Sequence, residues 1–135
     1  MADVEYLEEM AKRHRRLPRP RLCYLEIPAL DVQQSAAFYE KVFGWDIRHR
    51  DTSNPSFAYP SADVTGGWAT DRAISREPGL LPYIWVDSIE ETLAMIESCG
   101  GQVVRRPDTG AGGEYTATFR DPAGNVMGLH QETPR

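Results

Sequence analysis

The stretch IPALDVQQSAAFYEKVFGW, residues 27–45, joins the end of a strand to a complete helix. It continues an apolar, strand-like run, LCYLEIPAL, that begins at residue 22 and ends near Pro28. From Val32 to Phe43 the apolar residues share one face at helical spacing, and Gly44 is a typical C-terminal stop. The sequence therefore predicts a strand followed by a helix of about three turns.

Short strands are predicted on both sides of a linker that follows this helix. Three lie at 45–50, 56–59 and 65–70, separated by the turn residues Asn54, Pro55 and Pro60. After the linker the same order begins again, with a strand at 82–87, a helix at 89–99 and strands at 102–106, 114–120 and 125–131.

The two halves share spacing as well as order. Asp87 and Gly100 lie 56 residues after Asp31 and Gly44, which indicates a duplicated βαβββ module. One helix on one four-stranded sheet buries too little apolar surface, so the two modules should pack together. The expected fold is α+β, with two βαβββ modules forming a curled mixed sheet around a cleft.

The expected organisation is one domain with an N-terminal extension. Its parts are a helical extension at 1–20, a first module at 21–70, a linker at 71–81 and a second module at 82–132. Apolar residues at helical spacing from Val4 to Ala11 predict a helix that ends before Pro18. We expect it to pack on the main body or on a second subunit.

Composition limits the function classes. A chain of 135 residues with 41% hydrophobic residues is too short for a large multidomain enzyme, and a net charge of −5 argues against general nucleic-acid binding. Cys23 and Cys99 do not make a disulfide framework. No apolar run is long enough to span a membrane, and the N-terminus lacks the apolar segment of a signal peptide, so a soluble cytoplasmic protein is expected.

Two runs resemble a known family. Residues 27–45 and FRDPAGNVMGLHQ at 119–131 are similar to the vicinal oxygen chelate superfamily, which includes glyoxalase I, extradiol dioxygenases and bleomycin resistance proteins. The resemblance covers residues 22–132 and implies two βαβββ modules whose sheets enclose a cleft. Members that perform metal chemistry hold a divalent ion there with His and Glu side chains, as a Lewis acid.

This sequence lacks the ligands at the positions that the resemblance assigns to them. The two His positions fall on Tyr24 and Leu81, and the last Glu position falls on Gly128. The remaining Glu position lies in VTGGWAT, residues 64–70, which has no carboxylate. We therefore expect the fold without its usual metal and without another cofactor.

Other chemistry is possible in such a cleft. If Tyr24 faces the cleft, strand alternation places Glu26 on the same face, in what reads as an apolar central strand where a lone carboxylate is costly. His130 has the matching parity in the last strand, so Glu26 and His130 are candidates for a general base and a proton carrier. The expected substrate-binding residues are Tyr24, Trp68, Tyr83, Trp85 and Glu114.

Structural explanations exist for the same residues. Glu26 could form an ion pair with an arginine such as Arg120, His130 could be an exposed or hydrogen-bonded histidine, and the aromatic residues could belong to the core. A metal site rebuilt from Glu26, Glu114 and His130 is another alternative. The glycine run at 110–113 lacks the spacing of a phosphate loop and is interpreted as a lip over the cleft.

Three functions follow from these residues. The first is a metal-free protein that binds a small molecule in an aromatic cleft, including a non-catalytic, ligand-sequestering protein of the resistance type. The second is a metal-independent isomerase or lyase that uses Glu26 and His130. The third is a metal-dependent enzyme of the glyoxalase or dioxygenase type with a rebuilt ligand set. A homodimer is expected, with no nucleic-acid or membrane partner.

Overall fold

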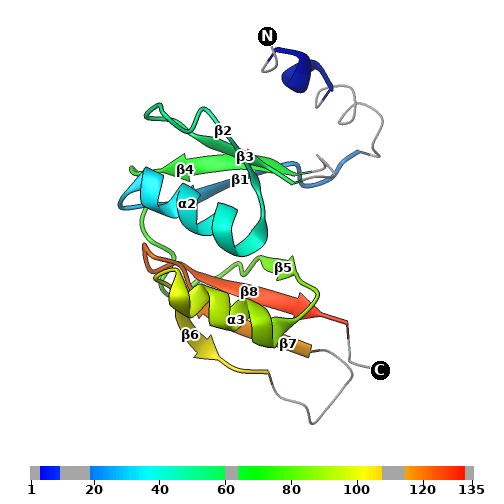
Figure 1. Ribbon diagram of the computed structural model, residues 1–135, viewed down its shortest axis with the longest axis vertical. Helices are drawn as coiled ribbons and strands as arrows, with labels where there is room; N and C mark the ends of the chain where they lie inside the picture. The colour runs from blue at the N-terminus through cyan, green and yellow to red at the C-terminus, as the bar shows by residue number, and fades with distance from the viewer. Residues whose placement is uncertain (1–3, 10–18, 60–63, 108–114, 133–135) are drawn as a thin grey trace.

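The computed structural model describes residues 4–9, 19–59, 64–107 and 115–132 and contains two four-stranded mixed sheets (Figure 1). The first sheet contains β1 (Tyr24–Pro28), β2 (Asp46–Arg48), β3 (Ser56–Ala58) and β4 (Thr65–Ala69), with α2 (Val32–Phe43) between β1 and β2. The second contains β5 (Tyr83–Trp85), β6 (Gln102–Arg105), β7 (Tyr115–Arg120) and β8 (Val126–Gln131), with α3 (Ile89–Ser98) between β5 and β6.

The two sheets have the same topology. Their strand orders are β1-β4-β3-β2 and β5-β8-β7-β6, and in each the first pair is parallel and the others are antiparallel. The prediction of an α+β fold made of two βαβββ modules is confirmed. Among the described residues, no helix has the length and apolar character that a membrane span requires.

The helix ends follow from local chemistry. The Asp31 side chain accepts a hydrogen bond from the Gln34 N–H and caps α2, while Gly44 takes the left-handed conformation with φ of 70° and donates to the Glu40 carbonyl. In the second module the cap is Ser88, whose hydroxyl accepts from the Glu91 N–H. The repeated aspartates are therefore not equivalent, since Asp87 precedes the capping residue.

The core is formed by the helix-facing sides of both sheets. Phe38 and Tyr39 on α2 are buried and meet Trp45, Trp68 and Phe119 at ring-centroid distances of 4.8 to 6.2 Å. Because α2 lies between the first sheet and the second module, its aromatic residues contact both (Figure 1). Burial of these rings therefore stabilises the packing of the two modules.

The turn between β7 and β8 connects the modules through a buried carboxylate. Asp121 accepts hydrogen bonds from the Tyr39 hydroxyl at 2.8 Å, the Asn125 side-chain amide at 2.8 Å and the backbone N–H groups of residues 123, 124 and 125 at 3.0 Å each. Asn125 also donates to the Pro28 carbonyl and accepts from the Ser75 N–H. The turn therefore ties β1, α2 and the linker to the second sheet.

A short helix at residues 4–9 lies on the other face of the first sheet from α2 (Figure 1). Tyr6 packs against Ala58, and the Arg48 guanidinium lies 3.7 Å from the centre of its ring. Burial raises the pKa of Tyr6. Within the predicted N-terminal helix, residues 10–18 lie outside the described residues.

Candidate functional site

Each sheet has one face that α2 and α3 do not cover, called its open face here, and strand alternation decides which side chains lie on it. On β1, Leu25 and Ile27 pack into the core, so Tyr24 and Glu26 lie on the open face. Tyr24 is 59% exposed. β1 is the edge strand of its sheet, and Glu26 is exposed and forms an ion pair with Arg72.

These observations correct the prediction that Glu26 lies in a central strand. Its carboxylate is in contact with solvent at a sheet edge, so the cost of burying a lone charge does not arise. The alternative that Glu26 forms a structural ion pair agrees with the structure, except that its partner is Arg72 and not Arg120. Arg120 instead donates to the carbonyls of Arg76 and Gly124.

Trp68 lies on the opposite face from the one that we expected. In the register of β1 and β4 it pairs with Ile27, whose side chain faces the core, and only 7% of Trp68 is exposed. Its ring lies 5.2 Å from that of Phe57. Trp68 is therefore a core residue in this fold and does not share a face with Tyr24.

The second sheet places three candidates together. Tyr83 and Trp85 lie on β5, and Trp85 pairs with His130 on β8. Tyr83 is 50% and Trp85 is 70% exposed, while His130 is half-buried. Glu114 and the glycine run at 110–113 lie outside the described residues.

The two predicted catalytic side chains lie on separate sheets. No hydrogen bond or ion pair joins Glu26 to His130 within the part of the chain that the structure describes. The open face of the first sheet also points away from the second module, because α2 lies between them (Figure 1). A Glu26–His130 pair is therefore not assembled within one chain.

A cavity of about 710 Å³ lies where the two modules meet. The first module contributes the end of α2 and the segments that follow β3 and precede β2, and the second contributes β5 and the start of α3. Its lining residues are Val42, Phe43, Trp45, Tyr59, Tyr83, Ile84, Trp85, Val86, Asp87, Ser88, Glu91 and Thr92. Two of them, Tyr83 and Trp85, are predicted substrate-binding residues.

The aromatic wall of this cavity is fixed on one side and exposed on the other. Trp45 is buried and lies 4.4 Å from the Phe57 ring and 5.3 Å from the Tyr59 ring. Trp85, on the opposite module, is mostly exposed. Rigid aromatic walls favour apolar ligands because little side-chain entropy is lost on binding.

Sequence reasoning missed most of the lining residues. Phe43, Trp45 and Tyr59 read as core residues of the first module, and Asp87 and Glu91 read as a helix start. These residues line a cavity only because β5 lies next to them, and that arrangement follows from the packing of the two modules. No spacing within either half contains this information.

The residues at the family's metal positions do not fit a divalent ion. Among the described residues, no three of His, Cys, Asp and Glu lie close enough together to hold one. At position 128 a Cβ would lie 2.5 Å from the Tyr83 ring, so that ring fills the space where a longer side chain would begin. Tyr24 and Leu81 offer no imidazole or carboxylate.

Comparisons with known proteins agree with the fold. Residues 24–130 match the model of the glyoxalase-like domain, so the chain belongs to this family. A comparison with curated proteins gives no match. The two βαβββ modules described above are thus those of a glyoxalase-like domain.

Several solved structures are similar to this chain. A glyoxalase/bleomycin resistance protein/dioxygenase family enzyme from Burkholderia phytofirmans PsJN has a TM-score of 0.66 at 18% identity, covering 84% of this chain and 99% of that one. The antibiotic-binding protein TnmS3 from Streptomyces sp. CB03234 has a TM-score of 0.64 at 23% identity, covering 87% and 99%. The fosfomycin resistance protein FosX from Listeria monocytogenes has 0.64 at 12% identity, covering 88% and 95%. These values show a shared fold.

Proposed function

We propose that this protein binds a small aromatic or apolar organic molecule, without a metal, in the cavity between its two modules. The observation that carries the proposal is that five aromatic residues, from both modules, line one cavity of about 710 Å³. A cavity of this size holds a drug-sized molecule. Phe43, Trp45 and Tyr59 come from the first module, and Tyr83 and Trp85 come from the second.

A binding function without catalysis needs only the residues that this cavity supplies. Its walls provide apolar area, and Ser88 and Thr92 add hydroxyl groups near the start of α3. One of the similar structures is an antibiotic-binding protein. Sequestration of an organic ligand in unchanged form is thus the role that we propose for the cavity.

Fluorescence of N-phenyl-1-naphthylamine, a neutral apolar probe, tests the proposal. We expect a saturable increase in probe fluorescence with a Kd in the micromolar range. Trp85→Ala should weaken binding about tenfold, because it removes a large, exposed ring from the cavity wall without disturbing the core. Leu22→Ala is the matched control, since Leu22 is 89% exposed and does not line the cavity. Equal loss in Leu22→Ala, or no saturation at all, would contradict the proposal.

A homodimer is the assembly that we propose. Tyr24 on the first sheet and Tyr83 and Trp85 on the second are large exposed side chains on open sheet faces. β1 and β5 are also edge strands, with one side free for pairing in the described structure. Light scattering should give twice the chain mass of 15.2 kDa, and a value of 15.2 kDa would exclude the dimer.

Metal-independent isomerase or lyase activity is the second candidate, and it depends on this dimer. Glu26 and His130 can act on one ligand only where two chains bring their open faces together, since one chain keeps them on separate sheets. The exposed Glu26 carboxylate beside Tyr24 favours this candidate. For any substrate found by screening, Glu26→Gln should lower kcat by at least about 100-fold. An unchanged kcat would remove Glu26 from the mechanism.

A further inference from the structure

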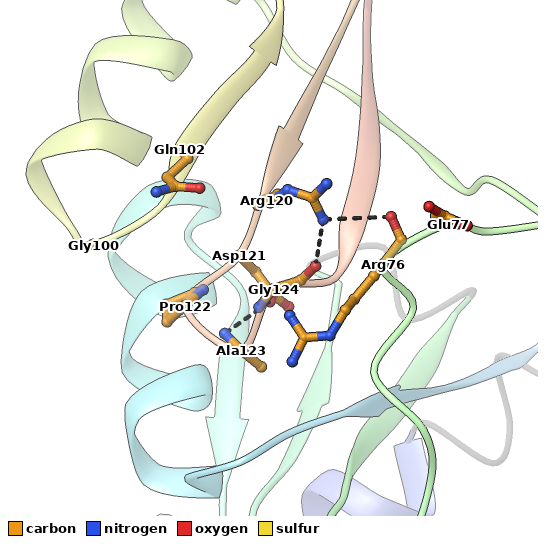
Figure 2. Close-up of a pocket in the computed structure, with 9 residues that line it drawn as sticks. All are labelled: Arg76, Glu77, Gly100, Gln102, Arg120, Asp121, Pro122, Ala123 and Gly124. Carbon is orange, nitrogen blue, oxygen red and sulfur yellow. Dashed lines mark hydrogen bonds between the residues drawn. The ribbon is translucent and has the colours of Figure 1, made fainter.

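A second cavity, of about 540 Å³, lies beside the turn between β7 and β8, at the end of the second module that adjoins the linker (Figure 2). It is bounded by the linker, the segment after α3 and the turn between β7 and β8. It shares no lining residue with the aromatic cavity. Two arginines line it, Arg76 from the linker and Arg120 from the end of β7.

In the part of the chain that the structure describes, these two arginines form no ion pair, and the same holds for Arg105, which donates to Thr116 instead. Arg48, Arg50, Arg72 and Arg106 each form an ion pair with an aspartate or a glutamate. For Arg76 and Arg120 the structure gives no ion pair within the described residues. In a chain with a net charge of −5, they bring two guanidinium groups without a carboxylate partner in the described structure to one cavity.

Backbone carbonyls hold the Arg120 guanidinium, and the Arg76 guanidinium lies against Gly124. Nη1 of Arg120 donates to the Gly124 carbonyl at 3.1 Å and to the Arg76 carbonyl at 3.4 Å, as the dashed lines in Figure 2 show. Nη1 of Arg76 lies 2.9 Å from the point that a Cβ at position 124 would occupy. Gly124, with φ of 107°, therefore gives the Arg76 guanidinium room against the turn.

The two acidic residues that line the cavity, Glu77 and Asp121, equal the two arginines in number, but only Glu77 is exposed. Asp121 is buried and its carboxylate is already held by Tyr39, Asn125 and three backbone N–H groups, so it is turned into the core. Glu77 is the other carboxylate among the lining residues, which leaves two cations against one exposed anion. Gln102, opposite Arg120 in the β6–β7 register, adds an amide donor.

We infer that this cavity is a binding site for a small anion or for the anionic group of a larger ligand, a carboxylate or a phosphate. Guanidinium groups present paired N–H donors that match the oxygens of either anion. The donors available to it are the Arg76 guanidinium, the Gln102 amide, and Nε and Nη2 of Arg120, for which the structure gives no acceptor among the described residues. This inference is independent of the proposed ligand in the aromatic cavity.

Titration with inorganic phosphate and with acetate, at constant ionic strength set with chloride, tests the site. We expect ¹H–¹⁵N spectra to show saturable shifts at Gly124 and at the Gln102 side chain, with a Kd of about 1 mM or tighter for at least one anion. Phosphate alone would identify a phosphate site, acetate alone a carboxylate site, and both a general anion site.

Variants separate this site from unspecific attraction of anions. Arg76→Gln, at an exposed position, should raise Kd about tenfold and leave the fold intact. Arg120→Gln should do the same, but it also removes hydrogen bonds to two carbonyls, so Arg76→Gln is the decisive variant. Arg106→Gln, at an exposed arginine of the same module outside the cavity, should change Kd less than twofold. Equal weakening by Arg106→Gln, or no saturable shift with either anion, would overturn the inference.

Discussion

Gly66 and Gly67 are neighbours on β4, and only Gly66 has no room for a side chain. A Cβ at position 66 would lie 2.0 Å from the Leu25 carbonyl oxygen and 2.5 Å from the Phe57 ring. At position 67 the nearest atom is 3.4 Å away. Because Phe57 is buried, neither the backbone nor the ring can move easily.

These contacts predict that the same substitution at the two positions destabilises the protein to different extents. Gly66→Ala should lower the free energy of unfolding by about 2 kcal/mol or more, because it overpacks the core. Gly67→Ala should change it by less than about 1 kcal/mol, since the new methyl group makes ordinary contacts. Urea denaturation of both variants measures the difference. Equal destabilisation would show that β1 and β4 do not pair in this register.

Tyr39 is fully buried with its hydroxyl on Asp121, and this contact makes stability depend on pH. Burial and the neighbouring carboxylate raise the pKa of Tyr39 well above its ordinary value of 10.0. Below pH 10 the phenol is protonated in the folded and the unfolded chain, so its stabilising contribution is complete. Above pH 10 the unfolded chain releases the proton and the folded chain retains it, which favours unfolding.

Tyr39→Phe tests this coupling. At neutral pH the variant should be less stable by about 1 to 3 kcal/mol, because Asp121 loses a buried donor. Above pH 10 the wild-type protein should lose about 1.4 kcal/mol per pH unit from this residue, and Tyr39→Phe should lack that slope. Urea midpoints across this range give both values. Tyr24→Phe, at an exposed position, is the control, and a slope unchanged in Tyr39→Phe would contradict the assignment.

At the scale of elements, the two helix starts show how far the repeat extends. The 56-residue offset aligns Asp31 with Asp87, but the cap of α3 is Ser88. Ser88→Ala should therefore lower the free energy of unfolding by about 1 kcal/mol, while Asp87→Ala should leave it within about 0.5 kcal/mol. Thermal unfolding of the two variants measures the change in stability. A larger loss of stability in Asp87→Ala than in Ser88→Ala would show that Asp87 is the residue that caps α3.

Local signals explain why the elements could be predicted. Periodicity, Gly44 and Gly100 and the order of strands depend on neighbouring residues, and both helices and all eight strands lie where those signals indicate. Strand order in a sheet depends on distant pairing. For that reason β1 was expected in the centre and lies at an edge, where Glu26 meets Arg72.

The candidate site was predictable only in part, for the same reason. Tyr83 and Trp85 follow from alternation within one strand, which the sequence shows directly. The face of Trp68 depends on its register with Ile27, which no local pattern determines. The cavity as a whole requires the position of Trp45 and Tyr59 against β5, which depends on how the modules pack.

At the scale of the whole molecule, Asn125 connects parts that are far apart in sequence. Its side chain donates to Pro28 at the end of β1, donates to Asp121 in its own turn, and accepts from the Ser75 N–H in the linker. Only 1% of its surface is exposed. Loss of this amide would take a hydrogen bond from the partly buried Pro28 carbonyl of the first module and from the Ser75 N–H of the linker, and one of its donors from Asp121.

Asn125→Ala should therefore destabilise the turn between β7 and β8 and also weaken the packing of the two modules against each other. We expect the free energy of unfolding to fall by about 2 kcal/mol or more, because several buried hydrogen bonds are lost together. Because the aromatic cavity lies where the modules meet, we expect binding of N-phenyl-1-naphthylamine to weaken as well, even though Asn125 does not line the cavity. Urea denaturation and probe titration measure the two effects, with Asn54→Ala, at an exposed loop position, as the control. Destabilisation with unchanged probe affinity would mean that the cavity does not depend on how this turn joins the modules.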